Sequence, residues 1–271
     1  MRQGVFPLTL GRYCARLAAG AADLAEAQAL RALAFATTDP DRDRFDDLCQ
    51  HVLVRERAGG SLVCCFRLLM LADGGGIGRS YSAQFYDLSA LGRYSGSMAE
   101  LGRFCVRPGH GDPDILRLAW ASLTACVDAG RVAMLFGCSS FAGTSPEPYL
   151  DSFALLAARH LAPDRWRPRV RADDVFNFAE QPRRDPDMRR AMLWMPPLLR
   201  SYLAVGGWVS DHAVVDRHLN TLHVFTGLET AAIPALRQRR LRAVACAGGA
   251  IPATSEAPPG DAIRGLCEDG R

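Results

Sequence analysis

The feature that most constrains the fold is a helix with a clear start and a clear stop, placed between two strand-like runs. Asp112 can cap this helix, Pro113 suits its first turn and Gly130 can end it. Residues 98–106 (MAELGRFCV) and 132–141 (VAMLFGCSSF) flank it as predicted strands. The helix carries an apolar stripe that predicts one core-facing side: Ile115, Leu116, Ala119, Trp120, Leu123, Cys126 and Val127. The pattern therefore predicts a helix packed against a sheet.

The other segments extend this pattern. Apolar spacing predicts a helix over residues 17–36, strand-like runs on either side of Gly59-Gly60 predict a β-hairpin, and residues 145–161 predict a second capped helix. The order α, β-hairpin, β, α, β, α, β indicates a mixed sheet flanked by helices, in one α/β or α+β domain. We assign this domain to residues 1–243. Residues 244–271 are rich in Ala, Gly and Pro, and we expect them to form a disordered tail.

The composition is that of a globular protein with one unusual property. A hydrophobic share of 49% excludes a mainly disordered chain. All 32 basic residues are arginine, because the sequence contains no lysine, and the formal net charge is +3. A GC-rich genome explains this usage, but arginine also suits phosphate, carboxylate and anionic membrane partners, which its planar fork binds bidentately. Composition alone does not separate the two explanations.

The cysteines indicate a reducing compartment. There are nine, an odd number, with no Cys-x-x-Cys pair and no histidine spacing suited to zinc, so we expect no metal site. Several lie inside apolar runs, which favours buried thiols in a cytoplasmic protein. The first residues lack the pattern of a signal peptide, and no apolar run approaches the roughly 18 residues of a membrane span. Any membrane contact is therefore expected to be peripheral, on the inner face of the cytoplasmic membrane.

Two charged residues in the predicted strand 98–106 are the first candidates for chemistry. A half-buried strand can simply carry Glu100 and Arg103 on its polar side. Alternatively, the two groups hold each other's charge in a cleft, which is one way to tune an active-site carboxylate. The strand is followed by a loop that contains Gly109 and Gly111 and opens the capped helix, and a helix N-terminus binds phosphate.

This strand, loop and helix resemble the pyrophosphate-binding element of acyltransferases of the GNAT class. The match is a degenerate one, from Val106 through Gly109 and Gly111 to Asp112. A carboxylate at Asp112 repels phosphate, which favours a donor with a single phosphate over coenzyme A. We therefore expect the enzyme to bind no cofactor of its own and to use the 4'-phosphopantetheine of a carrier protein.

A series of short motifs resembles the bacterial L-ornithine Nα-acyltransferases of ornithine-lipid synthesis. The motifs occur in the family's order over roughly residues 8–230: RALAF, FDDLCQHVLV, FRLL, YSAQFYDLS, MAELGRFCV, LFGCSSFAGT, HLAP, PPLLRSYLAVGGWV and VVDRHLNT. The resemblance implies a fold like those of GNAT enzymes and acyl-homoserine-lactone (autoinducer) synthases. It also implies transfer of a 3-hydroxyacyl group from acyl carrier protein to the α-amine of ornithine, giving lyso-ornithine lipid.

The sequence departs from the family pattern at several positions. Gln50 stands where the family has Asp, and residues 210–212 (Ser-Asp-His) replace Gly-Asp-Gly. Leu219 and His223 stand where the family often has Phe and Asp. The first departure leaves Asp43, Asp46 and Asp47 as the acidic candidates in that region.

The implied reaction requires a base, an oxyanion site and a pocket for ornithine. We expect Glu100 to accept the proton of the α-amine, directly or through a water. Backbone N–H groups near Phe104, Cys105 and Val106 are expected to stabilise the oxyanion. The reaction requires no covalent acyl-enzyme. The Cys105 thiol is a possible nucleophile beside this motif, or it is a buried structural group. Candidates for ornithine's carboxylate are Arg67 and Arg103, and candidates for its side-chain ammonium are Asp43 and Asp46.

Further candidates have two interpretations each. Arg31 and Phe35 match Arg and aromatic positions of the lactone synthases and can close the N-terminal segment over the acceptor, or they are a surface Arg and a core Phe. If residues 214–221 form a helix, Asp216 and Asn220 share one face, as a pocket wall or as an exposed flank.

The arginine clusters at residues 183–190 and 237–242 are solvated faces or contacts with an acidic carrier protein and an anionic inner membrane. Aromatic residues are not interleaved with them, so we expect no nucleic-acid role. Two other functions stay open. One is an acyl-homoserine-lactone synthase with S-adenosylmethionine as acceptor, and the other is a non-catalytic module that binds acyl carrier protein or membrane.

Overall fold

The computed structural model describes residues 5–234, 239 and 242. These residues form two compact units. The first unit contains residues up to 67 and residues 103–130, and the second contains residues 68–102 and 131–234. The predicted tail, residues 244–271, and the predicted domain boundary at 243 lie outside the described residues.

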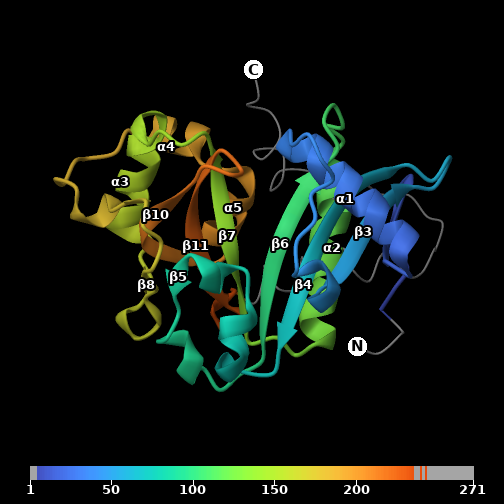
Figure 1. Cartoon of the computed structure of the whole chain (residues 1–271), viewed down its shortest axis with the longest axis horizontal. Helices are drawn as coiled ribbons and strands as arrows, with labels where there is room; N and C mark the ends of the chain where they lie inside the picture. Colours follow the sequence, from blue (N-terminus) through green and yellow to red (C-terminus); the bar gives the residue numbers. More distant parts are fainter. Residues whose placement is uncertain (1–4, 235–238, 240–241, 243–271) are drawn as a thin grey trace. The chain divides into compact units, whose positions relative to one another are not determined.

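In the first unit, two helices cover a five-stranded arrangement (Figure 1). The strands are hydrogen-bonded in the order β1-β2-β3-β4-β6, and β1–β2 and β2–β3 are antiparallel pairs. The elements are β1 (Leu8–Leu10), β2 (Tyr13–Leu17), α1 (Ala21–Phe35), a 3-10 turn (Asp46–Leu48), β3 (Gln50–Glu56), β4 (Leu62–Leu71, up to 67), β6 (Met98–Val106, from 103) and α2 (Pro113–Ala129).

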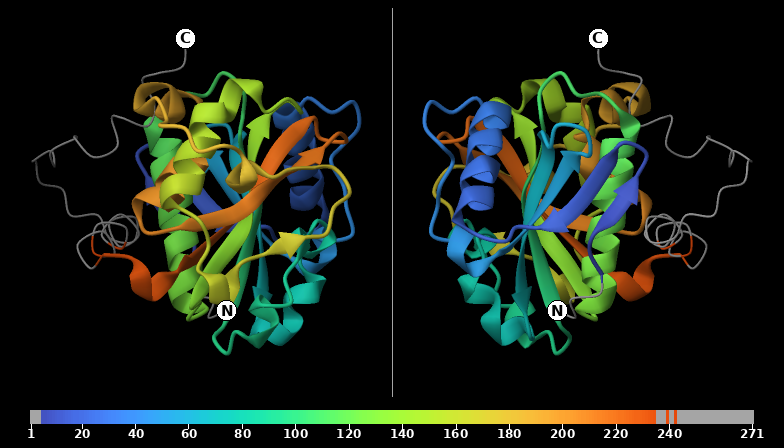
Figure 2. Two further views of the ribbon diagram at one scale, coloured as in Figure 1. Left: turned by 90° about the vertical axis from the view of Figure 1, so that its left-hand side faces the viewer. Right: turned by 90° about the vertical axis from the view of Figure 1, so that its right-hand side faces the viewer.

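Helices α1 and α2 lie on opposite faces of β3 and β4 in both views of the unit (Figures 1 and 2). Helix α1 packs on a core cluster of Ala27, Leu30, Leu53, Leu62, Cys65 and Cys105. Helix α2 has the predicted ends: the Asp112 side chain accepts a hydrogen bond from the Asp114 N–H, Pro113 opens the helix, and Gly130 caps it. The predicted ends of this helix are therefore confirmed, but its buried face includes Leu118 and Ala121, whereas the predicted Leu116, Trp120 and Val127 are only half-buried.

The second unit is built on a mixed sheet with the strand order β4-β6-β7-β11-β10-β9. Strands β6 and β7 are parallel, whereas β7–β11, β11–β10 and β10–β9 are antiparallel. The elements are β4 (from 68), 3-10 helices (Gly74–Arg79, Ser82–Gln84, Leu91–Arg93), β5 (Tyr86–Asp87), β6 (up to 102), β7 (Met134–Ala142), a 3-10 turn (Glu147–Tyr149), α3 (Leu150–Arg159), a 3-10 turn (Asp164–Trp166), β8 (Arg169–Val170), β9 (Val175–Phe176), a 3-10 turn (Phe178–Glu180), α4 (Met188–Trp194), α5 (Pro197–Ala204), β10 (Trp208–Asp216), β11 (Thr221–Glu229) and a last 3-10 turn (Thr230–Ala232).

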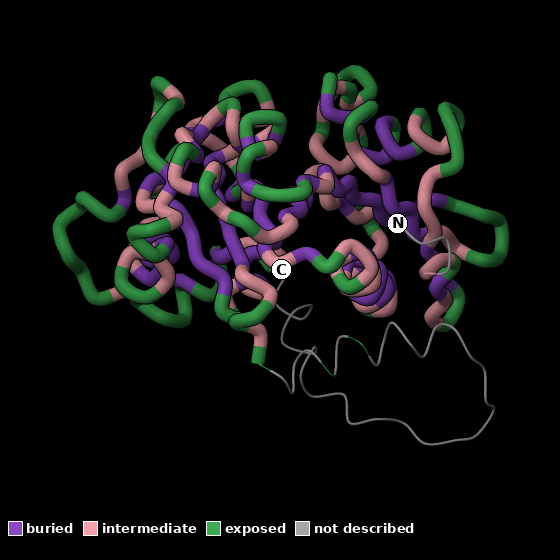
Figure 3. Tube along the Cα trace, turned by 90° about the horizontal axis from the view of Figure 1, so that it is seen from below, coloured by how far each residue is buried: buried purple, intermediate pink, exposed green. Residues whose placement is uncertain are grey.

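The two faces of this second sheet have different coverings, because successive side chains of a strand point to opposite faces. On β11, Leu222 and Val224 belong to the core beneath α3, α4 and α5. The intervening His223 and Phe225 contact the ring of Tyr86 on β5. Buried residues follow the strands and exposed residues follow the connecting loops (Figure 3).

The predicted mixed sheet flanked by helices is confirmed, but the structure differs from the sequence analysis in three places. The strands β1 and β2 were not predicted, and the helix expected from residue 17 begins at Ala21. Residues 214–221 do not form a helix: Asp216 ends β10, and Asn220 lies in the turn before β11 with a φ of 50°. Within the part of the chain that the structure describes, no helix is long and apolar enough to cross a membrane.

Candidate active site

The first unit brings five of the predicted site residues into one buried ion cluster: Arg31, Asp43, Asp46, Arg67 and Arg103. Asp46 lies at its centre. The Oδ1 atom of Asp46 accepts hydrogen bonds from Arg31 Nη1 and Arg67 Nη1, both at 2.7 Å. The Oδ2 atom accepts from Arg31 Nη2 at 2.8 Å and from Gln28 Nε2 at 2.9 Å. Four hydrogen bonds fill the acceptor capacity of one carboxylate.

Asp43 and Asp41 complete the cluster at its edge. Asp43 accepts a bidentate pair from Arg67 at 2.6 and 2.7 Å and a further hydrogen bond from Arg103 at 3.2 Å. Asp41 accepts a hydrogen bond from Arg103 Nε at 2.7 Å and forms an ion pair with Arg31, whose Nε lies 2.8 Å away. Three guanidinium groups thus meet three carboxylates, and these six side chains balance in charge.

The electrostatics of this ion cluster keep its carboxylates ionised. Burial alone raises the pKa of Asp46, but hydrogen bonds from Arg31 and Gln28 outweigh burial and hold the pKa well below its usual range. Burial also raises the pKa of Asp43, but the hydrogen bonds from Arg67 and the positive charges of Arg67 and Arg103 together outweigh burial and lower it. The His51 ring, which lies 2.9 Å from the Asp46 carbonyl oxygen, has a pKa lowered by burial.

Arg103 holds its place in the ion cluster through an uncommon backbone conformation. Its φ is 53°, in the left-handed region that residues other than glycine rarely adopt. The neighbouring Phe104 ring stacks on Phe66 at 5.6 Å between centroids. The Cys105 thiol is buried, 3.6 Å from the Cys65 sulfur, in the core beneath α1. This placement is that of a structural thiol.

The predicted phosphate loop follows β6 directly. Gly109 has a φ of 81°, and His110 N–H closes a turn onto the Arg107 carbonyl oxygen at 3.1 Å. The Asp112 carboxylate next to the loop accepts from the Tyr13 hydroxyl at 2.9 Å, and Arg12 lies 3.1 Å away as an ion pair. These two partners partly offset the negative charge that the sequence places at this helix N-terminus.

Glu100 lies in the second unit, buried on β6. Its Oε1 atom accepts hydrogen bonds from the Ser82 N–H at 2.7 Å and the Ser82 hydroxyl at 2.6 Å. Its Oε2 atom accepts from the Tyr81 N–H at 2.8 Å. Three donors suit an ionised carboxylate and fix its orientation. Glu100 pairs in register with Phe136 of the parallel strand β7.

A row of polar and aromatic groups continues from Glu100 on the same face of the second sheet. The Ser82 hydroxyl lies 3.4 Å from the Cys138 sulfur. Further along, the Tyr86 hydroxyl donates to the His223 carbonyl oxygen at 2.8 Å and lies 3.1 Å from His223 Nδ1. Burial lowers the pKa of His223 to about 4, so this imidazole is neutral near pH 7.

Asp216 and Asn220 do not share a site with Glu100. The end of the β10–β11 hairpin pairs Thr221 with Ala142, whereas Glu100 pairs with Phe136. Six residues of β7 separate these positions, or about 20 Å along a strand. Asp216 instead accepts hydrogen bonds from two backbone N–H groups of its own turn, at 2.9 and 3.0 Å.

Sequence reasoning missed Asp41, Gln28 and Ser82 as members of these sites. Asp41 belongs to an acidic run without periodicity, so nothing distinguished it from its neighbours. Gln28 stands three residues before Arg31 on α1, a spacing that places both side chains on one helical face. That spacing could have identified Gln28 as a neighbour of Arg31 in the site.

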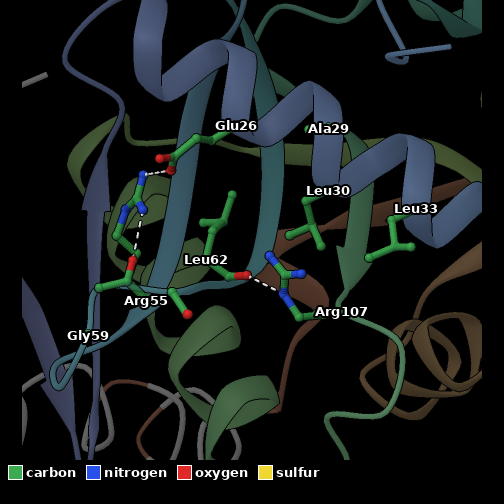
Figure 4. A pocket seen from close by; sticks show the side chains of 10 residues that line it. Glu26, Ala29, Leu30, Leu33, Arg55, Gly59, Leu62 and Arg107 are labelled. Atoms are coloured by element: carbon green, nitrogen blue, oxygen red, sulfur yellow. Dashed lines mark hydrogen bonds and ion pairs between the residues drawn. The ribbon is translucent and has the colours of Figure 1, made fainter.

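A pocket of about 400 Å³ lies elsewhere in the first unit, between α1 and the β3–β4 hairpin (Figure 4). Leu30, Leu33 and Leu62 line it. The two arginines that line it both have partners. Arg55 donates a hydrogen bond to the Glu26 carboxylate, and Arg107 Nε donates to the Leu62 carbonyl oxygen at 2.8 Å. None of the residues predicted for the active site lines this pocket. Among the described residues, no group of three or more His, Cys, Asp or Glu side chains is arranged to hold a metal ion.

The β6–loop–α2 element and the parallel β6–β7 pair are the architecture of an N-acyltransferase of the GNAT class. Residues 25–121 match the family model described as an acetyltransferase (GNAT) domain. The chain is 34% identical over 198 residues to the L-ornithine N(alpha)-acyltransferase of Rhodobacter capsulatus, which covers 71% of this chain and 76% of the relative. The chain belongs to the L-ornithine Nα-acyltransferase family.

A second relative has the same name, and one solved structure aligns over most of the chain. The enzyme of the same name from Brucella abortus is 29% identical over 235 residues, covering 80% of this chain and 84% of the relative. Among solved structures, TofI in a ternary complex with an inhibitor and MTA aligns with a TM-score of 0.46 and 15% identity, over 86% of this chain and 100% of that one.

Proposed function

We propose that this protein transfers a 3-hydroxyacyl group from acyl carrier protein to the α-amine of L-ornithine, giving lyso-ornithine lipid. The names of its relatives supply the acceptor. The observation that carries the mechanism is Glu100, a buried carboxylate on β6 whose orientation is fixed by Ser82 and Tyr81.

Glu100 acts as the general base in this proposal. An α-amine titrates near 8, so ornithine reaches the enzyme mostly protonated at neutral pH and must lose a proton before it attacks. The Ser82 hydroxyl, which donates to Glu100, offers a relay for this proton, and a water is the alternative. A positioned base contributes about 10²–10⁴-fold to the rate.

The amine then attacks the thioester carbonyl directly. Backbone N–H groups near Phe104, Cys105 and Val106 stabilise the oxyanion, and one such donor contributes roughly 3 kcal/mol. A covalent intermediate on Cys105 is not part of the proposal, because that thiol is buried against Cys65. The thiolate of the carrier leaves as the new amide bond forms, and it takes up a proton.

The ion cluster positions the acceptor side of the reaction. Asp46 and Asp43 each accept four hydrogen bonds, but the Asp46 side chain is 4% exposed whereas the Asp43 side chain is 20% exposed. We therefore assign the ornithine ammonium to Asp43. Its carboxylate is assigned to Arg103, which is 10% exposed, rather than to Arg67, which is 3% exposed. Phe35 of α1 is the proposed cover of this acceptor site, whereas Arg31 lies buried within the ion cluster and is not a surface arginine.

The donor is proposed to be a carrier protein whose 4'-phosphopantetheine presents one phosphate to the loop of Gly109 and Gly111. The carboxylate of Asp112 beside the loop favours one phosphate over two. The product is amphipathic, with an apolar acyl chain on a polar amino acid, so we propose that the enzyme works in the cytoplasm with a peripheral contact to the anionic inner membrane.

One assay tests the reaction. The purified protein is incubated with 3-hydroxyacyl carrier protein and labelled ornithine, and the label is expected in a lipid-soluble amide. Glu100→Gln is expected to lower kcat by at least about 100-fold while the circular dichroism spectrum is unchanged. The matched control is Glu147→Gln, the same change at an exposed glutamate of the same unit, and it is expected to retain full activity. Near-normal turnover by Glu100→Gln would remove Glu100 as the base.

Two other outcomes of the assay decide between enzyme classes. A lactone formed from S-adenosylmethionine, without an ornithine product, would identify a lactone synthase. No product with either acceptor would favour a non-catalytic module that binds carrier protein or membrane.

A further inference from the structure

Helix α4 concentrates exposed apolar side chains. Seven large hydrophobic residues are exposed among those that the structure describes, and four of them belong to this helix of seven residues. They are Met188 and Met192, each 42% exposed, Leu193 at 50% and Trp194 at 48%. Soluble proteins rarely expose such side chains side by side, so a concentration of this kind indicates a binding surface.

The helix that presents these side chains is firmly held. Its one buried residue, Ala191, belongs to the core of the second unit, and the Ala191 carbonyl oxygen accepts a hydrogen bond from the Ser152 hydroxyl at 2.8 Å. Asp187 caps the helix by accepting from the Arg190 N–H at 3.1 Å. The buried Asp151 carboxylate in turn accepts from the Asp187 N–H at 3.1 Å. The exposure of the apolar side chains is therefore a property of an ordered element.

Positive charge surrounds the apolar side chains. The segment 183–194 contains four arginines and two aspartates, a net charge of +2, and two of its arginines, Arg184 and Arg190, pair with the Asp151 carboxylate. Arg183 and Arg189 are exposed, and Arg200 of α5 donates to the Met192 carbonyl oxygen at 3.2 Å. Long apolar side chains, a tryptophan and arginines on one short helix form the combination that suits a membrane interface.

We infer that α4 inserts Met188, Met192, Leu193 and Trp194 into the interface of an anionic lipid bilayer, with Arg183 and Arg189 at the headgroups. A second copy of the chain fits less well, because a symmetric pair would place the like charges of two such helices against each other. The inference gives a location to the proposed membrane contact and rests on that contact, but it does not depend on the acyl-transfer reaction.

The experiment measures binding of the full chain to vesicles without ornithine or acyl donor, so a failure of the proposed reaction leaves the result interpretable. Phosphatidylcholine vesicles with and without phosphatidylglycerol are sedimented with the protein. The double variant Leu193→Ser, Trp194→Ser is expected to lower the partition coefficient on phosphatidylglycerol vesicles by roughly tenfold or more. Arg189→Gln is expected to lower it by about fivefold, and only on the anionic vesicles.

The matched control is Val170→Ser, which changes a residue of the same unit that is 48% exposed and lies on β8. It is expected to bind like the unchanged protein. Equal losses in the control and in the α4 variant, or no binding of the unchanged protein to anionic vesicles, would overturn the inference.

A second measurement guards against misfolding and other partners. Trp194→Phe preserves an apolar ring, and we expect it to bind vesicles normally but to lose most of the quenching by brominated lipid. Unchanged quenching would show that Trp194 is not in the bilayer. Normal vesicle binding by the Leu193→Ser, Trp194→Ser variant together with a raised KM for the carrier-protein donor would instead identify a carrier-docking surface. A change of its mass in solution would identify an interface between copies.

Discussion

At the scale of single residues, Asp46 shows how a candidate binding group can be a structural centre. Its four hydrogen bonds tie α1 to β4 through Arg31 and Arg67. A buried ion pair of this kind adds little to the free energy of folding compared with apolar residues of the same volume. Loss of one partner, however, leaves the charges of the others buried and uncompensated. The stability of the ion cluster therefore depends on each member, and so does the geometry of the proposed acceptor site.

Asp46→Asn is expected to destabilise the protein by about 3–5 kcal/mol, because it leaves buried guanidinium groups without a counter-charge. The measurement is the free energy of unfolding in urea. Asp47→Asn makes the same change at the next residue, which is exposed, and we expect a shift within about 0.5 kcal/mol. Equal effects of the two substitutions would contradict the central role of Asp46.

The sequence predicted some members of this ion cluster and missed others for a physical reason. Asp46 and Arg67 were candidates because motifs of a known family contain them, and Asp43 was a candidate because it is a carboxylate close to Asp46 in the sequence. Asp41 enters only because the chain between α1 and β3 folds back toward Arg31 and Arg103. Tertiary contacts of an irregular segment leave no periodic trace in a sequence.

At the scale of elements, the parts that can be predicted are those whose start and end are marked by particular residues. Helix α2 has a cap, a proline and a terminal glycine, and it was predicted within one residue at each end. Strands β1 and β2 are three and five residues long, too short for an alternation to stand out. The segment 214–221 has helical spacing, but pairing with β11 determines its structure.

The parallel pair of β6 and β7 is the element that presents Glu100, and one glycine permits its spacing. A Cβ atom on Gly137 would lie 2.3 Å from the Leu101 carbonyl oxygen. Gly137→Ala is expected to cost about 1–3 kcal/mol of stability, because the strand must shift. It is also expected to lower kcat by moving Glu100.

The control for this substitution is Gly92→Ala, where the added methyl group meets no atom within 4 Å. Urea unfolding and the transfer assay of both variants provide the comparison. Unchanged stability and activity in Gly137→Ala would show that β6 and β7 tolerate a wider separation.

At the scale of the whole molecule, stability should depend on pH through buried groups. His223 has a pKa of about 4 in the native protein because it is buried, against 6.5 in an unfolded chain. Below 6.5 the unfolded chain binds a proton that native His223 does not, so stability falls as the pH drops from about 6.5 to about 4. The difference amounts to about 3 kcal/mol.

The measurement is urea unfolding at pH 7 and pH 4.5. His223→Gln is expected to remove most of this pH-dependent loss, whereas His218→Gln, at an exposed turn position, should keep it. His51 acts in the same direction, because burial lowers its pKa too. Below about pH 4 the lowered pKa values of Asp43 and Asp46 add a second loss, as those carboxylates take up protons. An equal pH dependence in both histidine variants would contradict the assignment to His223.

The guanidinium groups of the ion cluster also bear on chemical selectivity. A thioester acylates any free amine that reaches it, and a lysine at a site like that of Arg67 would be such an amine. Arginine stays protonated at every pH at which the protein is folded, so it offers no lone pair for attack. In a chain without lysine, the proposed donor meets no side-chain amine of the enzyme itself. No side-chain amine of the enzyme therefore competes with the α-amine of the bound acceptor for the acyl group.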